Sequence, residues 1–395
     1  MRYVMLSAFT LIIVTTSFMP VQAQQAQSLL VNNPDISYTF GSSILFEAQI
    51  VLPSTPGDAY LLLREDGKDT QVIPIHPDDK GNVSENYPVG QGFITPFSTV
   101  YYYYRINLQS GEELNSQEFT FKYIDNLFTQ ELSSNGLTVH WYDGDLAFGQ
   151  AALNVAGRGV QHISELLTTN QVKPIDLYIY ASSADQTRSL QTGQLSSVGG
   201  HANPQLRLAF IAIAPGPEQG MEMDRKIPHE LAHILLYDTL GEHYFNVPVW
   251  LREGTASRLE LTPNPDYSTS LAQAKINNNL IPISNLCGAF PPENGQLLLA
   301  YAESESFTQY IISKFGQSNL IALANAYGDG MDCTQGMQQA LGQSLAQTEA
   351  EWLLTIKTEK PAPEATTAPT MFPYIIVFIT LIVVSISSAF LVKRT

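Results

Sequence analysis

The stretch Lys226–Glu260 reads KIPHELAHILLYDTLGEHYFNVPVWLREGTASRLE, and the interpretation of the whole chain depends on it. In its pentad HELAH, His229 and His233 are four residues apart. On a helix this spacing places both imidazoles on one face, one turn apart, where they can bind a single metal ion. Glu230 is turned about 100° away from His229, so it can hold and deprotonate a water molecule instead of binding the ion.

A catalytic zinc ion needs a third protein ligand and an open position for water. The segment PVWLREGTASRLEL lies between two prolines and predicts a second helix, which carries Glu253. The loop between the two helices is long enough to set them antiparallel and to bring Glu253 beside the histidines. His243, in that loop, and His201, in GGHANP, are alternative third ligands. The pattern therefore predicts Zn²⁺ with a catalytic base at Glu230 and with three ligands, His229, His233 and Glu253.

HELAH followed by PVWLREGTA resembles the gluzincin metallopeptidases, in particular the exported peptidase-MA-like domains related to aminopeptidase N and thermolysin. The likeness covers roughly residues 127–357, and besides the two helices it is specific at Tyr301–Gly316, YAESESFTQYIISKFG. This segment is similar to the family's helix whose leading Tyr reaches the zinc, so the resemblance implies a catalytic role for Tyr301. The family's G-x-M-E-N-type exopeptidase loop is matched only faintly by GPEQGMEMD, which leaves endopeptidase action equally open.

The residues before and after position 125 show different patterns. From about Ser28 to Tyr123, apolar and aromatic runs of strand length alternate with turn-forming segments, which predicts an all-β sandwich of immunoglobulin or fibronectin type. Strands followed by mostly helical sequence up to about Lys357 predict an α+β, zincin-like metallopeptidase domain. The strand LRLAFIAIA, residues 206–214, is either the sheet edge along which an extended peptide lies or an interior strand.

The two ends of the chain predict a protein on a membrane. A positive residue, an apolar run and the ending VQA indicate a secretory signal peptide. Near the other end, about 20 uncharged residues are long enough to cross a bilayer, with a removable lipid-anchor signal as the alternative. Two basic residues follow, and they predict a cytoplasmic end. The expected organisation is 1–23 signal peptide, 24–125 β-sandwich, 126–357 gluzincin peptidase-MA-like domain, 358–372 Pro/Thr-rich linker, 373–392 transmembrane helix and 393–395 cytoplasmic tail.

Charge and cysteine content narrow the function further. The formal net charge is −17 with a pI near 4.7, which argues against nucleic acid as a partner. The two cysteines, Cys287 and Cys333, are expected to form one disulfide in an exported chain. The sequence therefore predicts a single-pass, membrane-anchored zinc metallopeptidase whose extracytoplasmic body cleaves peptides or proteins. The alternative is a catalytically silent, peptidase-like binding or adhesion protein at the cell surface.

Overall fold

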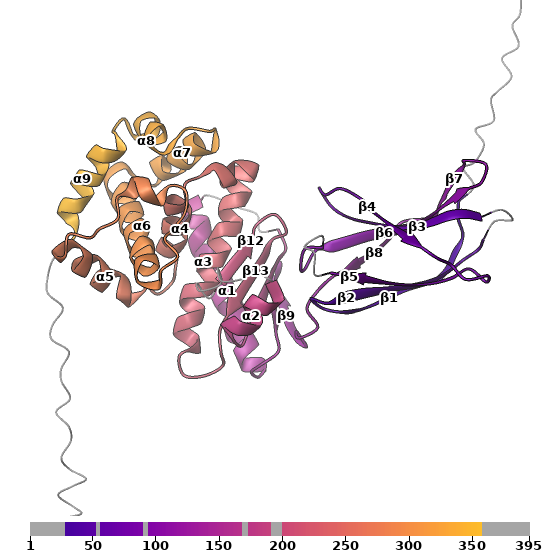
Figure 1. Ribbon diagram of the computed structural model, residues 1–395. Helices are drawn as coiled ribbons and strands as arrows, with labels where there is room; N and C mark the ends of the chain where they lie inside the picture. The colour runs from indigo at the N-terminus through magenta and orange to yellow at the C-terminus, as the bar shows by residue number, and fades with distance from the viewer. Residues whose placement is uncertain (1–27, 53–55, 90–93, 168–172, 191–199, 358–395) are drawn as a thin grey trace, which may run out of the picture. The chain divides into compact units, whose positions relative to one another are not determined.

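The computed structural model describes residues 28–52, 56–89, 94–167, 173–190 and 200–357. The chain divides into an N-terminal unit and a C-terminal unit between Asn126 and Leu127 (Figure 1). The sequence analysis placed this boundary after residue 125. Each unit encloses a separate cluster of buried apolar side chains.

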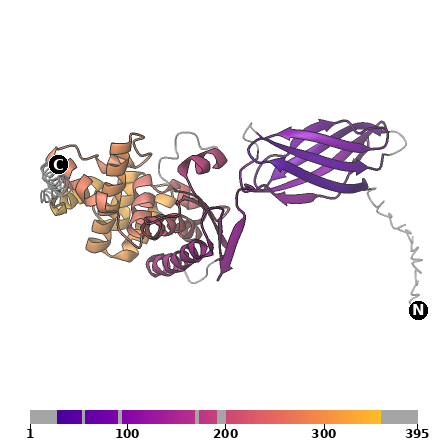
Figure 2. The same ribbon diagram turned by 90° about the horizontal axis from the view of Figure 1, so that it is seen from below.

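The N-terminal unit is built from two antiparallel sheets, one ordered β1-β2-β5 and one ordered β4-β3-β6-β7, with β8 also pairing with β6 (Figures 1 and 2). Along β6, Tyr102 and Tyr104 are buried while Tyr101 and Tyr103 are partly exposed, as the two-residue period of a strand requires. The expected all-β unit is therefore confirmed. Its strands are β1 (Val31–Thr39), β2 (Ser43–Ile50), β3 (Pro56–Glu65), β4 (Gln71–Ile75), β5 (Asn82–Pro88), β6 (Thr99–Leu108), β7 (Glu113–Asn115) and β8 (Phe119–Lys122).

The C-terminal unit contains a five-stranded sheet in the order β12-β13-β11-β10-β9. The central strands β10, β11 and β13 are parallel, and the outer strands β9 and β12 run antiparallel to their neighbours. The segment LRLAFIAIA forms β13, which is an interior strand, so the edge near the HELAH helix is β12 instead. The strands are β9 (Gln130–Ser134), β10 (Leu137–Trp141), β11 (Ile175–Tyr180), β12 (Gly200–Asn203) and β13 (Leu208–Ala212).

Helices pack on this sheet and continue beyond it. α1 and α3 pack against each other and against the sheet, and α4 packs against both α3 and α6 (Figure 1). The helices are α1 (Leu146–Leu167), α2 (Ser183–Leu190), α3 (Gln219–Leu240), η2 (Gly241–Asn246), α4 (Val249–Arg258), α5 (Pro265–Ile276), η3 (Ile283–Leu286), α6 (Asn294–Phe315), α7 (Gln317–Gly328), α8 (Cys333–Leu341) and α9 (Leu345–Thr355).

The HELAH helix, α3, starts earlier than the sequence suggests. Proline is most common in the first turn of a helix, but α3 begins at Gln219 and Pro228 lies inside it. Proline has no N–H, so it cannot donate to the carbonyl four residues earlier, that of Asp224. In the structure the N–H of Leu261, just beyond α4, donates to the Asp224 carbonyl at 2.9 Å. The proline is tolerated because another segment satisfies this acceptor, and the bond fixes the end of α4 against α3.

Two predictions about covalent and membrane anchoring have different outcomes. Cys287 and Cys333 form a disulfide, as expected. The prediction of a single C-terminal transmembrane helix is contradicted, because no helix in the described part of the chain is long and apolar enough to cross a membrane. The predicted signal peptide, linker and tail, and residues 373–392 themselves, lie outside the described residues.

Candidate metal centre

Three side chains from two helices converge at one point in the C-terminal unit. His229 and His233 come from α3 and Glu253 comes from α4, and one possible ligand atom of each lies within 4.8 Å of the others. Glu253 Oε2 is 3.4 Å from His229 Nε2 and 3.5 Å from His233 Nε2. Two imidazole nitrogens and one carboxylate oxygen are a donor set typical of catalytic zinc. The structure thus brings together the three ligands predicted from the sequence.

The packing of α4 on α6 explains how Glu253 reaches this point. Gly254, the next residue, faces α6 so closely that an added Cβ would lie 2.3 Å from the Ser304 carbonyl oxygen. A side chain at this position would push the two helices apart. The close approach also brings α6 to the metal-binding group, so that the Tyr301 ring lies 6.1 Å from the His229 ring. Tyr301 is two turns inside α6, which starts at Asn294, whereas the sequence analysis placed it at the start of the helix.

Glu230 is buried, with 5% of its surface exposed, and it lies against the edge strand β12. An added Cβ at Gly200 of β12 would lie only 2.1 Å from Glu230 Oε1, so the strand passes close to this carboxylate only because the residue there is glycine. Burial raises the pKa of Glu230, while the nearby His229 and His233 lower it by a smaller amount. This carboxyl group is therefore a stronger proton acceptor, once ionised, than an exposed glutamate.

Each histidine is contacted at its Nδ1 atom by a residue that the sequence did not indicate. Glu260 Oε1 lies 3.3 Å from His229 Nδ1, and the Tyr244 hydroxyl lies 3.0 Å from His233 Nδ1. Such partners fix the ring orientation, so that Nε2 points toward the metal position. Glu260 follows Glu253 by two helical turns in the same quoted stretch, a spacing that could have identified it. Tyr244 lies in the 3-10 helix η2, where no sequence period indicates a role.

The buried ionisable groups of the site shift one another's pKa values. Burial lowers the pKa of His229, but the carboxylates of Glu253 and Glu260 outweigh it and raise this pKa to about 10. Burial raises the pKa of Glu253, but His233 and His229 outweigh it and hold this pKa below its ordinary value. Burial, together with Glu253 and Glu230, raises the pKa of Tyr301 well above its ordinary value. Tyr301 is therefore a neutral hydroxyl donor at physiological pH.

Neither alternative third ligand joins the three converging side chains. The side chain of His243 is 58% exposed in η2, and its Nδ1 lies 3.4 Å from Asp329 Oδ1. His201 is in β12 and lines a cavity of about 330 Å³ together with the three converging residues. Within the described ranges, neither His243 nor His201 is part of the group of possible ligand atoms.

The fold and the site define a metallopeptidase-like unit with a two-histidine, one-glutamate centre. A family model described as the peptidase MA superfamily matches residues 155–358, which is more than half of the chain. The chain belongs to this superfamily, and the predicted relation to the gluzincin peptidases is confirmed.

Comparison with solved structures and curated proteins gives fainter likenesses. An M1 zinc metallopeptidase from Deinococcus radiodurans is 12% identical; the match covers 87% of this chain and 97% of that one, with a TM-score of 0.35. A structure titled as a Br derivative of BhCBM56 is 9% identical, covers 22% of this chain and 88% of that one, and has a TM-score of 0.18. No curated protein matches the sequence. The superfamily assignment rests on the family model.

Proposed function

We propose that this protein is a zinc-dependent metallopeptidase that hydrolyses peptide bonds. The observation that carries the proposal is the convergence of His229, His233 and Glu253 beside the buried carboxylate of Glu230. The donor set fits zinc, and the partners at both Nδ1 atoms leave the Nε2 atoms directed at the metal position. A zinc ion held here would polarise a substrate carbonyl and acidify a water molecule.

The residues around the metal position have separate roles in this proposal. Glu230 accepts the proton of the attacking water and returns it to the leaving nitrogen, a task for which burial raises its pKa. Tyr301, a neutral donor on a rigid ring, stabilises the negative oxygen of the tetrahedral intermediate. His229, His233 and Glu253 are the three ligands.

The edge strand β12 suits the binding of an extended peptide. Gly200, His201 and Ala202 of this strand line the cavity that contains the metal-binding group. A peptide that pairs with the edge of β12 that no described strand occupies would place its backbone beside Glu230, because β12 passes close to that carboxylate at Gly200. The substrate is accordingly a peptide or an extended segment of a protein.

The disulfide between Cys287 and Cys333 supports a place of action outside the reducing cytosol. The Cys287 carbonyl also accepts a hydrogen bond from the N–H of Val249, the first residue of α4. The disulfide therefore ties the start of the helix that carries Glu253 to α8. We infer that the protein works in an oxidising compartment, in which this connection persists.

Metal analysis and peptide cleavage test the proposal together. Replacing His229, His233 or Glu253 by Ala should remove bound zinc, whereas Glu230→Gln should keep zinc and abolish cleavage, because it removes a base and not a ligand. Elemental analysis gives the zinc content, and a proteome-derived peptide library incubated with the full chain gives the cleavage. Full zinc in Glu253→Ala would return the third-ligand role to His201 or His243. If neither the wild type nor Glu230→Gln cleaves any peptide, the alternative of a binding protein would be favoured.

A further inference from the structure

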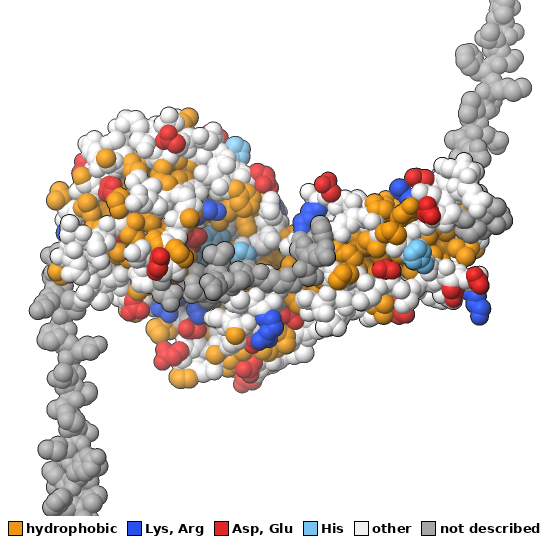
Figure 3. All heavy atoms as spheres, viewed as in Figure 1, with side chains coloured by type: hydrophobic (Ala, Val, Ile, Leu, Met, Phe, Trp, Pro, Cys, Tyr) orange, Lys and Arg blue, Asp and Glu red, His pale blue; other side chains and the backbone are white. Residues whose placement is uncertain are grey.

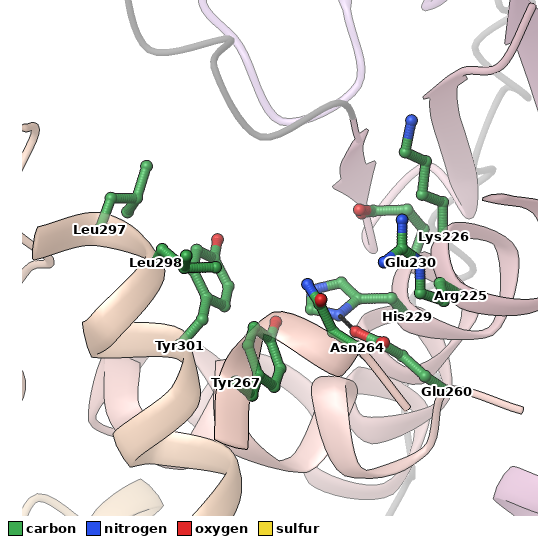
Figure 4. Close-up of a pocket in the computed structure, with 10 residues that line it drawn as sticks. All are labelled: Arg225, Lys226, His229, Glu230, Glu260, Asn264, Tyr267, Leu297, Leu298 and Tyr301. Atoms are coloured by element: carbon green, nitrogen blue, oxygen red, sulfur yellow. Dashed lines mark hydrogen bonds and ion pairs between the residues drawn. The ribbon is translucent and has the colours of Figure 1, made fainter. Parts of the chain in front are cut away.

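A cavity of about 300 Å³ lies directly beside the candidate metal centre and shares His229, Glu230 and Tyr301 with it. Figure 4 shows its two walls. Leu297 and Leu298 of α6 lie on one side with Tyr301, and the residues from α3 lie on the other. Because the cavity adjoins the groups proposed to act on the scissile bond, its occupant would be a substrate residue next to that bond.

Arg225 lines this cavity one helical turn before His229 and on the same face of α3. The sequence has 37 acidic and only 20 basic residues, so most arginines have an acidic neighbour. Within the described residues, Arg225 forms no ion pair, whereas ion pairs are made by Arg64, Arg105, Arg158, Arg188 and Arg207.

The two other described arginines without an ion pair have other partners. Arg252 stacks over the Tyr244 ring at 5.1 Å, and Arg258 donates to Gln309. Arg225 makes neither kind of contact with any described residue. Its guanidinium is thus a cation at the cavity wall, and no described residue forms an ion pair with it. On the face drawn in Figure 3, acidic side chains are spread over the C-terminal unit. Arg225 forms no ion pair with a described residue although this unit carries many acidic side chains.

The other charged groups of the cavity already have partners or roles. Lys226 Nζ lies 3.0 Å from Glu222 Oε2 and 2.8 Å from the Ala212 carbonyl oxygen. Glu260 faces His229, and Glu230 is the proposed base. An incoming group would therefore meet apolar walls, formed by leucine side chains and the Tyr267 ring, together with one available cation. This combination suits a residue with an aliphatic stem and a terminal carboxylate, which guanidinium binds through two parallel hydrogen bonds.

We propose that this cavity is a substrate subsite in which Arg225 binds a carboxylate of the residue next to the scissile bond. The carboxylate would come from an acidic side chain or from the C-terminus of a short peptide. The proposal rests on the peptidase function proposed above and names the substrate class of the same site. Arg225 is thus a specificity-determining residue.

The test compares matched peptides on the zinc-loaded full chain. Glu and Gln are exchanged at each position on either side of the cleaved bond, and short peptides are offered with a free or an amidated C-terminus. One carboxylate should raise kcat/KM about 10- to 100-fold over its neutral counterpart, as for a hydrogen bond between charged groups. Arg225→Gln should remove this preference, and Arg225→Glu should reverse it toward Lys at the same position.

Binding to the non-cleaving Glu230→Gln protein, measured by calorimetry, supplies a second readout. The same carboxylate preference should appear there and should disappear when Arg225→Gln is added. Arg252→Gln, which removes the other arginine near the centre, is the matched control and should keep the preference. Cleavage without any carboxylate preference, or a preference that survives Arg225→Gln, would overturn the subsite alone. Absence of both cleavage and binding would overturn the peptidase function, and the subsite with it.

Discussion

The interiors of the two units differ in how they treat charge. In the N-terminal unit the core consists of aliphatic and aromatic side chains, and the buried Glu65 has Lys68 as a partner at 3.0 Å. The C-terminal unit buries His229, Glu230 and His233 side by side on α3, and it also buries Glu303 on α6. Burying charged groups costs free energy unless they are paired or bind a metal. The cluster of ionisable side chains around His229 is therefore a cost to folding that the proposed metal ion and reaction would explain.

The largest effect expected is one that should stay within the N-terminal unit. Phe46 is fully buried and packs edge-to-face on Tyr102, with ring centroids 5.1 Å apart. Phe46→Ala should lower the free energy of unfolding of this unit by about 3–5 kcal/mol, because it leaves a cavity in an apolar core. Calorimetry should show one transition moving to lower temperature, with zinc content unchanged. Loss of zinc in this variant would contradict the separation of the two cores.

A change of similar size in the C-terminal unit should affect only catalysis. Tyr301→Phe removes the hydroxyl that is proposed to stabilise the oxyanion and keeps the ring between His229 and Phe290. The expected loss is about 10²- to 10³-fold in kcat, with KM and zinc content nearly unchanged, because the bond strengthens only in the transition state. Steady-state kinetics measures it. A kcat within a few-fold of wild type would end the assignment of Tyr301.

Glu303 allows a test of what buried charge costs in the absence of metal binding. Burial raises its pKa to about 8, the N–H of Ile281 lowers it, and Glu349 on α9 raises it. Since this pKa is higher in the folded than in the unfolded protein, the folded state binds more protons between pH 4.5 and 8, so stability falls as pH rises through this range.

Glu303→Gln keeps the acceptor for Ile281 and cannot ionise. Between pH 5 and 8 the free energy of unfolding of wild type should fall by about 3 kcal/mol more than that of the variant. Denaturant titrations across this range measure the difference. Parallel curves for the two proteins would show that Glu303 ionises normally in the folded state.

The smallest effect concerns the residues behind the ligands. Glu260→Gln should weaken zinc binding about 10- to 100-fold, because the amide holds His229 less firmly and adds no negative charge. Competition with a chelator of known affinity gives the dissociation constants. Glu222→Gln, on the same helix as His229 but paired with Lys226, is the control and should change little. Equal affinities in the two variants would assign Glu260 to packing alone.

Local pattern predicted what lies within one or two helical turns. The spacing of His229, His233 and Glu253 indicated their convergence because a helix and a short connection determine most of that geometry. The burial of Tyr102 and Tyr104 in β6 is equally local, because it follows the two-residue period of a strand. The extent of α3, by contrast, depends on a hydrogen bond to Asp224 from a residue 37 positions away, and no local pattern contains it.

The parts of the site that sequence did not indicate depend on contacts between distant segments. Gly200 lies against Glu230 only because β12 adds to the edge of a sheet whose strand order cannot be read from residue types. Tyr244 reaches His233 through the path of η2, which has no apolar period. The role proposed for Arg225 depends on a cavity that it shares with the leucines of α6, which are more than 70 residues away along the chain. The predicted transmembrane helix was based on hydropathy and length alone, and no helix in the described part of the chain is long and apolar enough to span a membrane.

The proline inside α3 has a consequence for how related sequences vary. As long as residue 228 is proline, the Asp224 carbonyl depends on the N–H of residue 261, so residue 261 itself cannot become proline. Where a relative has another residue at position 228, the helix can satisfy that carbonyl by itself, and position 261 is released. An alignment of superfamily members should therefore contain sequences with proline at one of these positions, or at neither, but never at both.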